Sequence, residues 1–444
     1  MTTNRAFCDG INRRDLLRIG LAGSLGGAVS LPQLLAASGK ATGGATAKAD
    51  SVIILFLKGG LSTIDTLDLK PKAPSEFRGE FDPIATNVPG IEICSHLPKL
   101  AQTANRFSLL RSMTHQNSDH GGADHYMLTG YAPAPGFNPG LKPNNQRPAH
   151  GSMISRQLGP RGGVPAYVCV PKAHASAGSA YLGSLNAPFV VEADPNQPNF
   201  SVPDLMPPLT VDSSRLNDRR ALSAVVDRFA KDGENEINKS AKQLSTFQQK
   251  AFELVTSTET RKAFDIAEES DKLRDAYGRH TLGQSCLLAR RLVQAGVRCV
   301  TIDHQNWDTH YDNFKVLKND LLPHLDMALP LLLTDLDDRG LLDRTLVIVM
   351  GEFGRTPRVN QYAGRDHWGP SNCILLAGGG IKHGLAIGKT NARGERPDGD
   401  PTSPEDLAAT MHYLLGIDPN EEFYTPEGRP VKVVNGGKVV YGLV

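Results

Sequence analysis

The sequence has few cysteines, few aromatic residues and almost no net charge. Only 6 of its 444 residues are cysteine and 6% are aromatic, and 48 Lys and Arg against 47 Asp and Glu leave a formal charge of +1. A near-neutral chain has no overall electrostatic basis for binding nucleic acid or an anionic membrane surface. Beyond residue 49, no apolar run approaches the roughly 18 to 20 residues that a spanning helix needs. We therefore expect neither a nucleic-acid partner nor a membrane span in the mature chain.

The cysteines do not form a recognisable metal-binding pattern. Cys8 lies in the N-terminal segment, and the other five are widely spaced with no CxxC pair. These five are Cys94, Cys169, Cys286, Cys299 and Cys373. The spacing excludes a zinc knuckle and favours buried, small apolar side chains. One disulfide is the alternative in an oxidising compartment.

The N-terminus has the pattern of a twin-arginine export signal. Arg13 and Arg14 precede a weakly apolar stretch rich in Gly and Ala. A buried or membrane-anchoring helix is disfavoured there, because each Gly costs about 1 kcal/mol inside a helix. We expect cleavage after Ala49, or alternatively near residues 36–38, so that residues 1–49 form the signal peptide. The mature protein would then be periplasmic or secreted.

The mature chain, residues 50–444, alternates strand-like and helix-like patterns. Continuous apolar runs occupy residues 51–57, 166–170, 297–302, 345–350 and 373–377. Such runs are typical of parallel strands buried on both faces. In a doubly wound α/β sheet, ligands bind outside the carboxyl ends of the strands. Residues that follow these runs are therefore candidates for a functional site.

Helical patterns lie between the predicted strands. They cover residues 97–107, 314–339 and 404–415, and a long polar amphipathic region spans about 214–290. We expect this last region to be an inserted or peripheral layer. The helix at 404–415 follows a capping Ser403, with Pro at its first position and acidic residues in its first turn.

Histidine and aspartate gather in three clusters at predicted strand ends. The clusters are residues 115–125, residues 303–313 and residues 351–369. Carboxylate oxygens together with imidazole nitrogens suit a divalent metal. The alternative is structural, because Asp and His beside glycines commonly cap helices or form turns. Arg355 and Arg365 add the cations that a sulfate or phosphate ester requires, although each could instead pair with a neighbouring Asp.

Several segments resemble the uncharacterised exported family called domain of unknown function 1501. They are residues 59–68, 78–81, 277–278, 289–293, 307–310, 350–357 and 364–368. The resemblance covers essentially the whole mature chain. That family is grouped with the alkaline phosphatase and sulfatase superfamily, which implies an alkaline-phosphatase-like α/β/α sandwich with a mostly parallel central sheet. Members of the superfamily bind one or two divalent metals and hydrolyse phosphate or sulfate esters through a Ser, Thr or formylglycine nucleophile.

The sequence departs from the superfamily pattern at three places. The acidic pair expected after the first strand is replaced by Gly59 and Gly60, with Asp65 and Asp68 further along. The sulfatase nucleophile motif Cys/Ser-x-Pro-x-Arg is absent, and its nucleophile position falls on His120, near Ser118. Where the superfamily has an Asp-His pair, this chain has Glu352 followed by Phe353. One imidazole ligand of the superfamily is therefore missing from its expected position.

These observations lead to a specific expectation for the site. The expected ligands of a divalent metal (zinc, calcium, magnesium or manganese) are Asp308, His310, Glu352, Asp366 and His367. Ser118 or His120 would be the nucleophile or general acid/base, and Arg355 would contact the oxyanion. The expected activity is metal-dependent hydrolysis of a sulfated or phosphorylated small molecule or glycan. The alternative is a non-catalytic relative that binds an anionic glycan or a protein partner.

The export signal is testable without further structural information. Replacing Arg13 and Arg14 together with Lys should leave the precursor in the cytoplasm, because the export receptor reads the paired guanidinium groups. Cell fractionation and the size of the unprocessed chain would measure this. Normal export of the double variant would refute the assignment.

Overall fold

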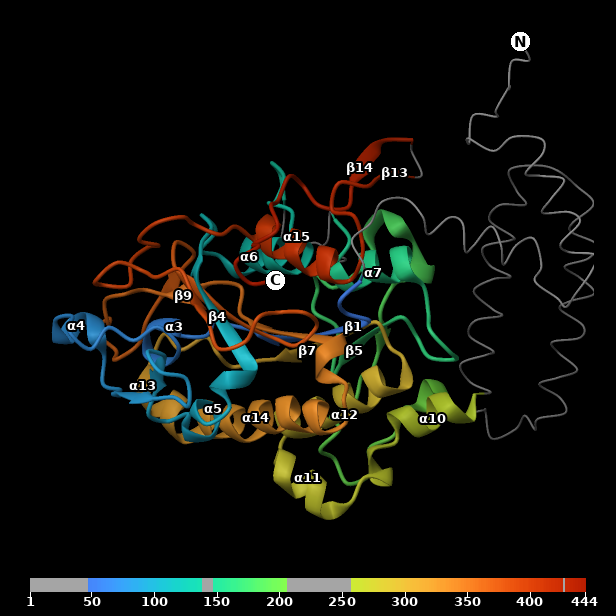
Figure 1. Ribbon diagram of the computed structural model, residues 1–444, viewed down its shortest axis with the longest axis horizontal. Coiled ribbons are helices and arrows are strands. Elements are labelled where there is room, and N and C mark those ends of the chain that lie inside the picture. Colours follow the sequence, from blue (N-terminus) through green and yellow to red (C-terminus); the bar gives the residue numbers. More distant parts are fainter. Residues whose placement is uncertain (1–46, 138–146, 206–256, 426–427) are drawn as a thin grey trace, which may run out of the picture. The chain divides into compact units, whose positions relative to one another are not determined.

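A computed structural model of the protein describes residues 47–137, 147–205, 257–425 and 428–444 (Figure 1). Helices cover both faces of an eight-stranded sheet. The predicted α/β/α sandwich with a mostly parallel central sheet is therefore confirmed. The twin-arginine pair lies outside the described residues and its role remains a prediction.

The sheet has the strand order β12-β4-β11-β8-β1-β7-β5-β6. The strands are β1 (Ser51–Leu57), β4 (Phe107–Met113), β5 (Tyr167–Val170), β6 (Phe189–Val190), β7 (Cys299–His304), β8 (Thr345–Met350), β11 (Asn372–Ala377) and β12 (Ala386–Ile387). β1 pairs in parallel with both β7 and β8. All five predicted apolar runs are strands of this sheet.

Two expectations about these segments are wrong. The run at 373–377 was expected to be parallel, but β11 is antiparallel to both β8 and β4. Its direction is reversed because the chain returns from β8 without crossing the sheet. The expected helix at 97–107 is only the short α5 (Pro98–Ala101), followed by a 3₁₀ turn before β4 begins. The apolar residues from Phe107 onward extend instead, because they are buried within the sheet.

Alternating side chains of β1 supply two separate hydrophobic cores, as the period of two of a strand requires. Ile53, Leu55 and Leu57 belong to one core, and Val52, Ile54 and Phe56 to the other. The first core packs against α12 (Thr281–Ala295), α14 (Leu322–Asp338) and α5, and the second against α6 (His120–Thr129), α7 (His150–Leu158) and α15 (Pro404–Leu414). Burying each of these side chains contributes about 1.5 to 3 kcal/mol.

The remaining helical predictions have different outcomes. α13 (Asn313–Val316), a π-helical turn and α14 together occupy the predicted helix at 314–339. α15 begins with a capping box, in which Ser403 Oγ accepts from the Asp406 N–H and Asp406 Oδ2 accepts from the Ser403 N–H.

The polar region at 214–290 is described only from residue 257, where it forms α10 (Thr258–Phe264), α11 (Asp271–Tyr277) and the start of α12. α12 packs against β1 and β7, so this end of the region is part of the layer that covers the sheet.

The described cysteines are all buried and free, as the sequence favoured. Burial raises the pKa of Cys169 and Cys286 to about 12, which keeps both as thiols. Residues near the expected cleavage site also pack into the body: Ala49 is buried, and its N–H donates to the Leu414 carbonyl (2.9 Å). The cleavage position remains a prediction.

No helix among the described residues combines the length and the apolarity that crossing a bilayer would require.

The topology brings the three His/Asp clusters to one edge of the sheet. β1, β7 and β8 are parallel, and β4 has the same direction because β11 is antiparallel to both β8 and β4. Their carboxyl ends therefore share an edge. Residues 351–371 leave β8 at this edge and enter β11 at the same edge. This is the position at which open α/β sheets bind ligands.

Two buried histidines between α7 and α15 should make the fold sensitive to acid. Burial lowers the pKa of His150 to about 4 and that of His412 to about 3, so both are neutral in the folded protein. The unfolded chain takes up their protons near pH 6.5, so their contribution is present above that pH and is lost as the pH falls toward 4. Each histidine should cost about 2 kcal/mol of stability at pH 5.

Melting temperatures at pH 7 and pH 5 measure this effect. The decrease should be smaller in His412→Leu than in the wild type, and unchanged in the control His383→Leu, because His383 is exposed. Equal decreases in the wild type and His412→Leu would contradict the prediction.

Candidate metal centre

Asp308 reaches the sheet edge through a close contact between two loops. After β7 the chain turns back, and the Trp307 N–H donates to the Lys58 carbonyl (3.1 Å). Gly59 lies against this turn at φ 114°, where a Cβ atom would be 2.3 Å from the Asp308 nitrogen. Only glycine fits such a position, both sterically and in its backbone conformation. Gly59 therefore allows the Asp308 carboxylate to sit directly beyond the end of β1.

Arg355 holds Asp308 in place from the buried side of the carboxylate. It lies in the short strand β9 (Gly354–Arg355) and is 2% exposed. Its Nη2 donates to Asp308 Oδ1 (2.5 Å), and its other hydrogen bonds go to the carbonyls of Gly59, Gly60, Trp307 and Arg365. The Arg355 guanidinium thus contacts five protein oxygens and positions Asp308. From the sequence, Arg355 was expected to contact an oxyanion instead.

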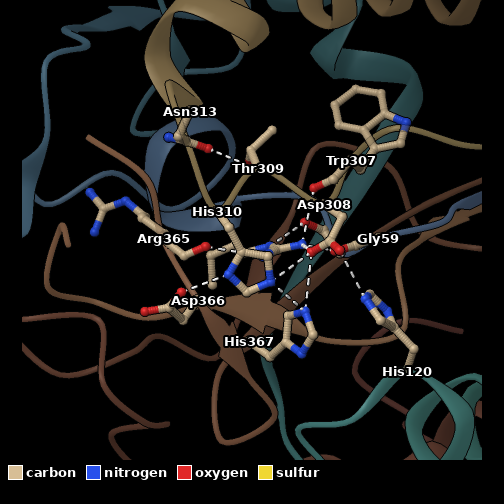
Figure 2. Close-up of polar contacts among 12 residues, drawn as sticks. Gly59, His120, Trp307, Asp308, Thr309, His310, Asn313, Arg365, Asp366 and His367 are labelled. Carbon is tan, nitrogen blue, oxygen red and sulfur yellow. Dashed lines mark hydrogen bonds and ion pairs between the residues drawn. The ribbon is translucent and has the colours of Figure 1, made fainter. Parts of the chain in front are cut away.

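Three imidazoles converge on Asp308 (Figure 2). Nε2 of His310 and Nε2 of His367 each lie 3.1 Å from Asp308 Oδ1, and Nε2 of His120 lies 3.1 Å from Oδ2. The Nε2 atoms of His310 and His367 are themselves only 2.9 Å apart. His120 begins α6, His310 follows β7, and His367 lies in β10 (His367–Trp368), so the three come from distant parts of the chain.

Each imidazole is held from behind at its other nitrogen. Nδ1 of His120 contacts Glu352 Oε1 (2.7 Å), Nδ1 of His310 contacts Asp366 Oδ1 (2.6 Å), and Nδ1 of His367 contacts the Ser118 carbonyl (3.0 Å). All three partners are acceptors, so each Nδ1 carries the hydrogen. In the neutral tautomer this leaves the Nε2 lone pair facing the centre, as in histidines that bind metals.

The sequence predicted Glu352 and Asp366 as metal ligands, but in the structure each of them contacts an imidazole nitrogen. Glu352 is fully buried behind His120, and its two carboxylate oxygens also accept from the Gly59 N–H at 2.9 and 3.1 Å. Asp366 is half exposed and binds His310 and the Asn360 amide. Both acids orient imidazoles instead of facing the centre. The sequence contains no signal for this distinction, because it depends on how the loops pack.

Ser118 lies beside the centre on the exposed side. Its hydroxyl oxygen accepts from the Gly369 N–H (3.0 Å), which leaves the hydroxyl hydrogen available to a further partner. Its carbonyl orients His367 as described above.

Arg365 forms a buried ion pair close to the centre, one of the two roles that the sequence allowed for it. Arg365 and Asp65 are both fully buried, with Nε–Oδ2 and Nη2–Oδ1 distances of 2.7 and 2.8 Å. This confirms the structural alternative for Arg365. Breaking a buried pair by removing one partner typically costs about 3 to 5 kcal/mol. Asn313 also donates to Asp65, so the pair joins the loops that carry His310 and His367.

His120, Asp308 and Glu352 shift one another's pKa values. Hydrogen bonds with Asp308 and Glu352 raise the pKa of His120 to about 9. Burial alone would raise the pKa of Asp308, but its polar contacts with His120, His367 and Arg355 hold that pKa well below its usual range. Burial raises the pKa of Glu352, and His120 opposes that effect. We place the shared proton on His120, because it donates to both acids. A metal would have to displace this proton, so its affinity should fall as the pH falls below about 9.

The donor atoms fit a divalent metal ion. One ligand atom each from His120, Asp308 and His367 lie within 4.8 Å of one another, and Nε2 of His310 is adjacent. Imidazole nitrogens with a carboxylate oxygen suit Zn²⁺ better than Ca²⁺ or Mg²⁺, which favour sites made of oxygen alone.

The sequence profile of the family described as "Protein of unknown function (DUF1501)" matches residues 49–444. No curated protein matches the chain. Similar solved structures include the lipoteichoic acid synthase LtaP from Listeria monocytogenes, at 10% identity and a TM-score of 0.35, with 84% of this chain and 73% of that chain covered. The PsFucS1 sulfatase from Pseudoalteromonas sp. has 16% identity and a TM-score of 0.36, with 92% of this chain and 72% of that chain covered. Similarities this low carry no information on activity.

The centre should bind one divalent cation. Protein stripped with a chelator should take up Zn²⁺ in isothermal titration calorimetry. Asp366→Asn should lower the affinity by about 10- to 100-fold, because it loosens the hydrogen bond that orients His310. Asp308→Asn should lower it further, because it removes the charge facing the ion.

The matched control is Asp398→Asn, because Asp398 is an exposed acid paired with Lys389 away from the centre. Its affinity should equal that of the wild type. Unchanged Zn²⁺ uptake by Asp308→Asn would show that the cation binds elsewhere.

Proposed function

We propose a hydrolytic function for this chain, which belongs to the DUF1501 family of proteins of unknown function. In this proposal it is an exported, metal-dependent hydrolase of sulfate or phosphate esters. The observation that carries the proposal is the convergence of three Nε2 atoms on one carboxylate, with every Nδ1 held by an acceptor. Histidines that only support a fold do not need this shared orientation.

His120, Asp308, His310 and His367 would hold the ion. When bound, a divalent metal supplies a Lewis acid that polarises an ester oxygen and offsets developing negative charge. The protein's own contribution is orientation: Arg355 positions Asp308, while Glu352, Asp366 and the Ser118 carbonyl orient the imidazoles. These partners keep the donor atoms in place before substrate binds.

Ser118 is the better candidate for the nucleophile. His120 occupies the position expected from the superfamily, but both of its nitrogens are engaged by Asp308 and Glu352. The Ser118 hydroxyl is exposed and its hydrogen is available. His120 would instead serve the metal, and Ser118 or a water molecule would attack the ester.

One observation favours the non-catalytic alternative. Phe353 is buried and stacks on His367, with ring centroids 4.4 Å apart. By resemblance to the superfamily, this position would hold a metal-binding imidazole. A centre with an altered ligand set could retain an anionic glycan without hydrolysing it.

The hydrolase proposal predicts slow hydrolysis of 4-nitrophenyl sulfate or 4-nitrophenyl phosphate by the mature protein, and loss of that activity on chelation. His367→Ala should lower kcat by about 100-fold or more, because it removes a ligand needed to stabilise charge in the transition state. Its melting temperature should change little. Ser118→Ala should abolish turnover if the hydroxyl is the nucleophile, and should leave it measurable if water attacks.

The control is His383→Ala, which removes an exposed imidazole outside the centre. If the wild type hydrolyses neither ester after loading with zinc, calcium, magnesium or manganese in turn, the binding alternative takes precedence.

A further inference from the structure

An open cavity of about 950 Å³ adjoins the metal centre, and His310 and Asp366 form part of its wall. Its volume lies within the roughly 300 to 1,000 Å³ of typical ligand sites. Tyr311 and Tyr362 also line it, and they are 62% and 53% exposed. Their ring centroids are 4.9 Å apart, with an interplanar angle of 44°. Two large aromatic rings thus face solvent together beside the proposed site of hydrolysis.

The backbone holds these two rings together at a cost. Asp312 and Ala363, the residues that follow the two tyrosines, have φ values of 48° and 53°. Residues other than glycine rarely adopt this conformation, which costs on the order of 1 to 3 kcal/mol where it is strained. The Asp312 N–H donates to the Tyr362 carbonyl (3.1 Å), and the Asn313 N–H donates to the Ala363 carbonyl (2.9 Å). The two turns therefore support each other and keep the tyrosines side by side.

Asn360 ties the tyrosine pair to the metal centre. Its side-chain oxygen accepts from the N–H groups of Tyr362 (2.9 Å) and Gly364 (3.0 Å). Its side-chain nitrogen donates to the His310 carbonyl (3.0 Å) and lies 3.3 Å from Asp366 Oδ1. One amide thus fixes the loop of Tyr362 relative to His310 and to the acid that orients His310. A molecule lying on the tyrosines would have a defined position relative to the centre.

Arg358 places a positive charge in the cavity, whose carboxylate, Asp366, is engaged by His310 and Asn360. Its side chain is exposed and lines the cavity, and it pairs with no carboxylate within the described parts of the chain. An exposed guanidinium of this kind is suited to bind a sulfate or carboxylate. The neighbouring amide of Gln361 can exchange hydrogen bonds with hydroxyl groups.

We propose that this cavity is a subsite for a sugar ring of an anionic glycan. One face of the ring would lie on Tyr311 and Tyr362, since a pyranose presents apolar C–H groups on its faces and hydroxyls at its edge. Arg358 would bind a sulfate or carboxylate group of the same chain. The assignment of the glycan as the substrate of the centre rests on the proposed function, whereas its binding to the cavity does not.

Glycan binding can be measured apart from turnover. Chelator-treated mature protein would be applied to an array of neutral and sulfated oligosaccharides, and affinities for the best sulfated oligosaccharide and its desulfated form would follow by calorimetry. We expect the wild type to prefer the sulfated form. The double variant Tyr311→Ala/Tyr362→Ala should bind at least about 10-fold more weakly, and Arg358→Gln should lose the preference for sulfate.

Two controls separate stacking from damage to the fold. Tyr311→Phe/Tyr362→Phe should retain binding, because stacking uses the rings. Tyr424→Ala/Tyr441→Ala should also retain it, because these exposed tyrosines do not line the cavity. The melting temperature and the Zn²⁺ stoichiometry of each variant would be measured in parallel.

The outcomes distinguish this proposal from the hydrolase proposal. No oligosaccharide binding by the wild type, or equal losses in the cavity and control alanine variants, would overturn the subsite even if aryl esters are hydrolysed. Oligosaccharide binding that depends on the tyrosine pair would establish the subsite even if no ester is hydrolysed, and only the hydrolase proposal would then fail.

Discussion

The ion pair between Asp308 and Arg355 determines the geometry of the whole centre. The guanidinium is buried, so it needs a carboxylate and several carbonyls to offset the loss of hydration. Asp308 meets that need with one oxygen and still accepts contacts from three imidazoles at its exposed side. A charge required inside the protein thus fixes the position of a charge at its surface. Removing either partner would leave the other in an unfavourable environment.

The sheet places the remaining groups around this pair. Gly59, His120, Asp308 and Glu352 all follow carboxyl ends of strands, and His367 lies just before β11. Because neighbouring strands share one edge, residues more than 200 positions apart can contact one carboxylate without long connections across the molecule. Glu352 and Asp366, the acids that orient His120 and His310, lie on the same connection between β8 and β11 as His367.

Much of the fold could be predicted because continuous apolar runs identify buried strands. Direction could not, since a run such as residues 373–377 reads the same in either orientation and only the return of the chain makes β11 antiparallel. The sequence also singled out Asp308, His310 and His367, which the structure brings into contact. It could not tell that Glu352 and Asp366 face imidazoles, because a carboxylate has the same composition whether it binds a metal or a histidine. Tyr311 and Tyr362 carry no local signal at all, because their pairing depends on two turns meeting in space.

The antiparallel connection from β8 to β11 also determines where the chain can accept insertions near the centre. Residues 351–371 begin and end at neighbouring positions on the same edge, so their length is not constrained by the need to span the sheet. Doubling the length of a flexible loop costs only about 0.6 kcal/mol in closure entropy. Arg358, Asn360 and Tyr362 all lie on this excursion, whereas Asp308 and His120 do not. Insertions here could reshape the ligand cavity while the strands that carry the rest of the centre keep their register.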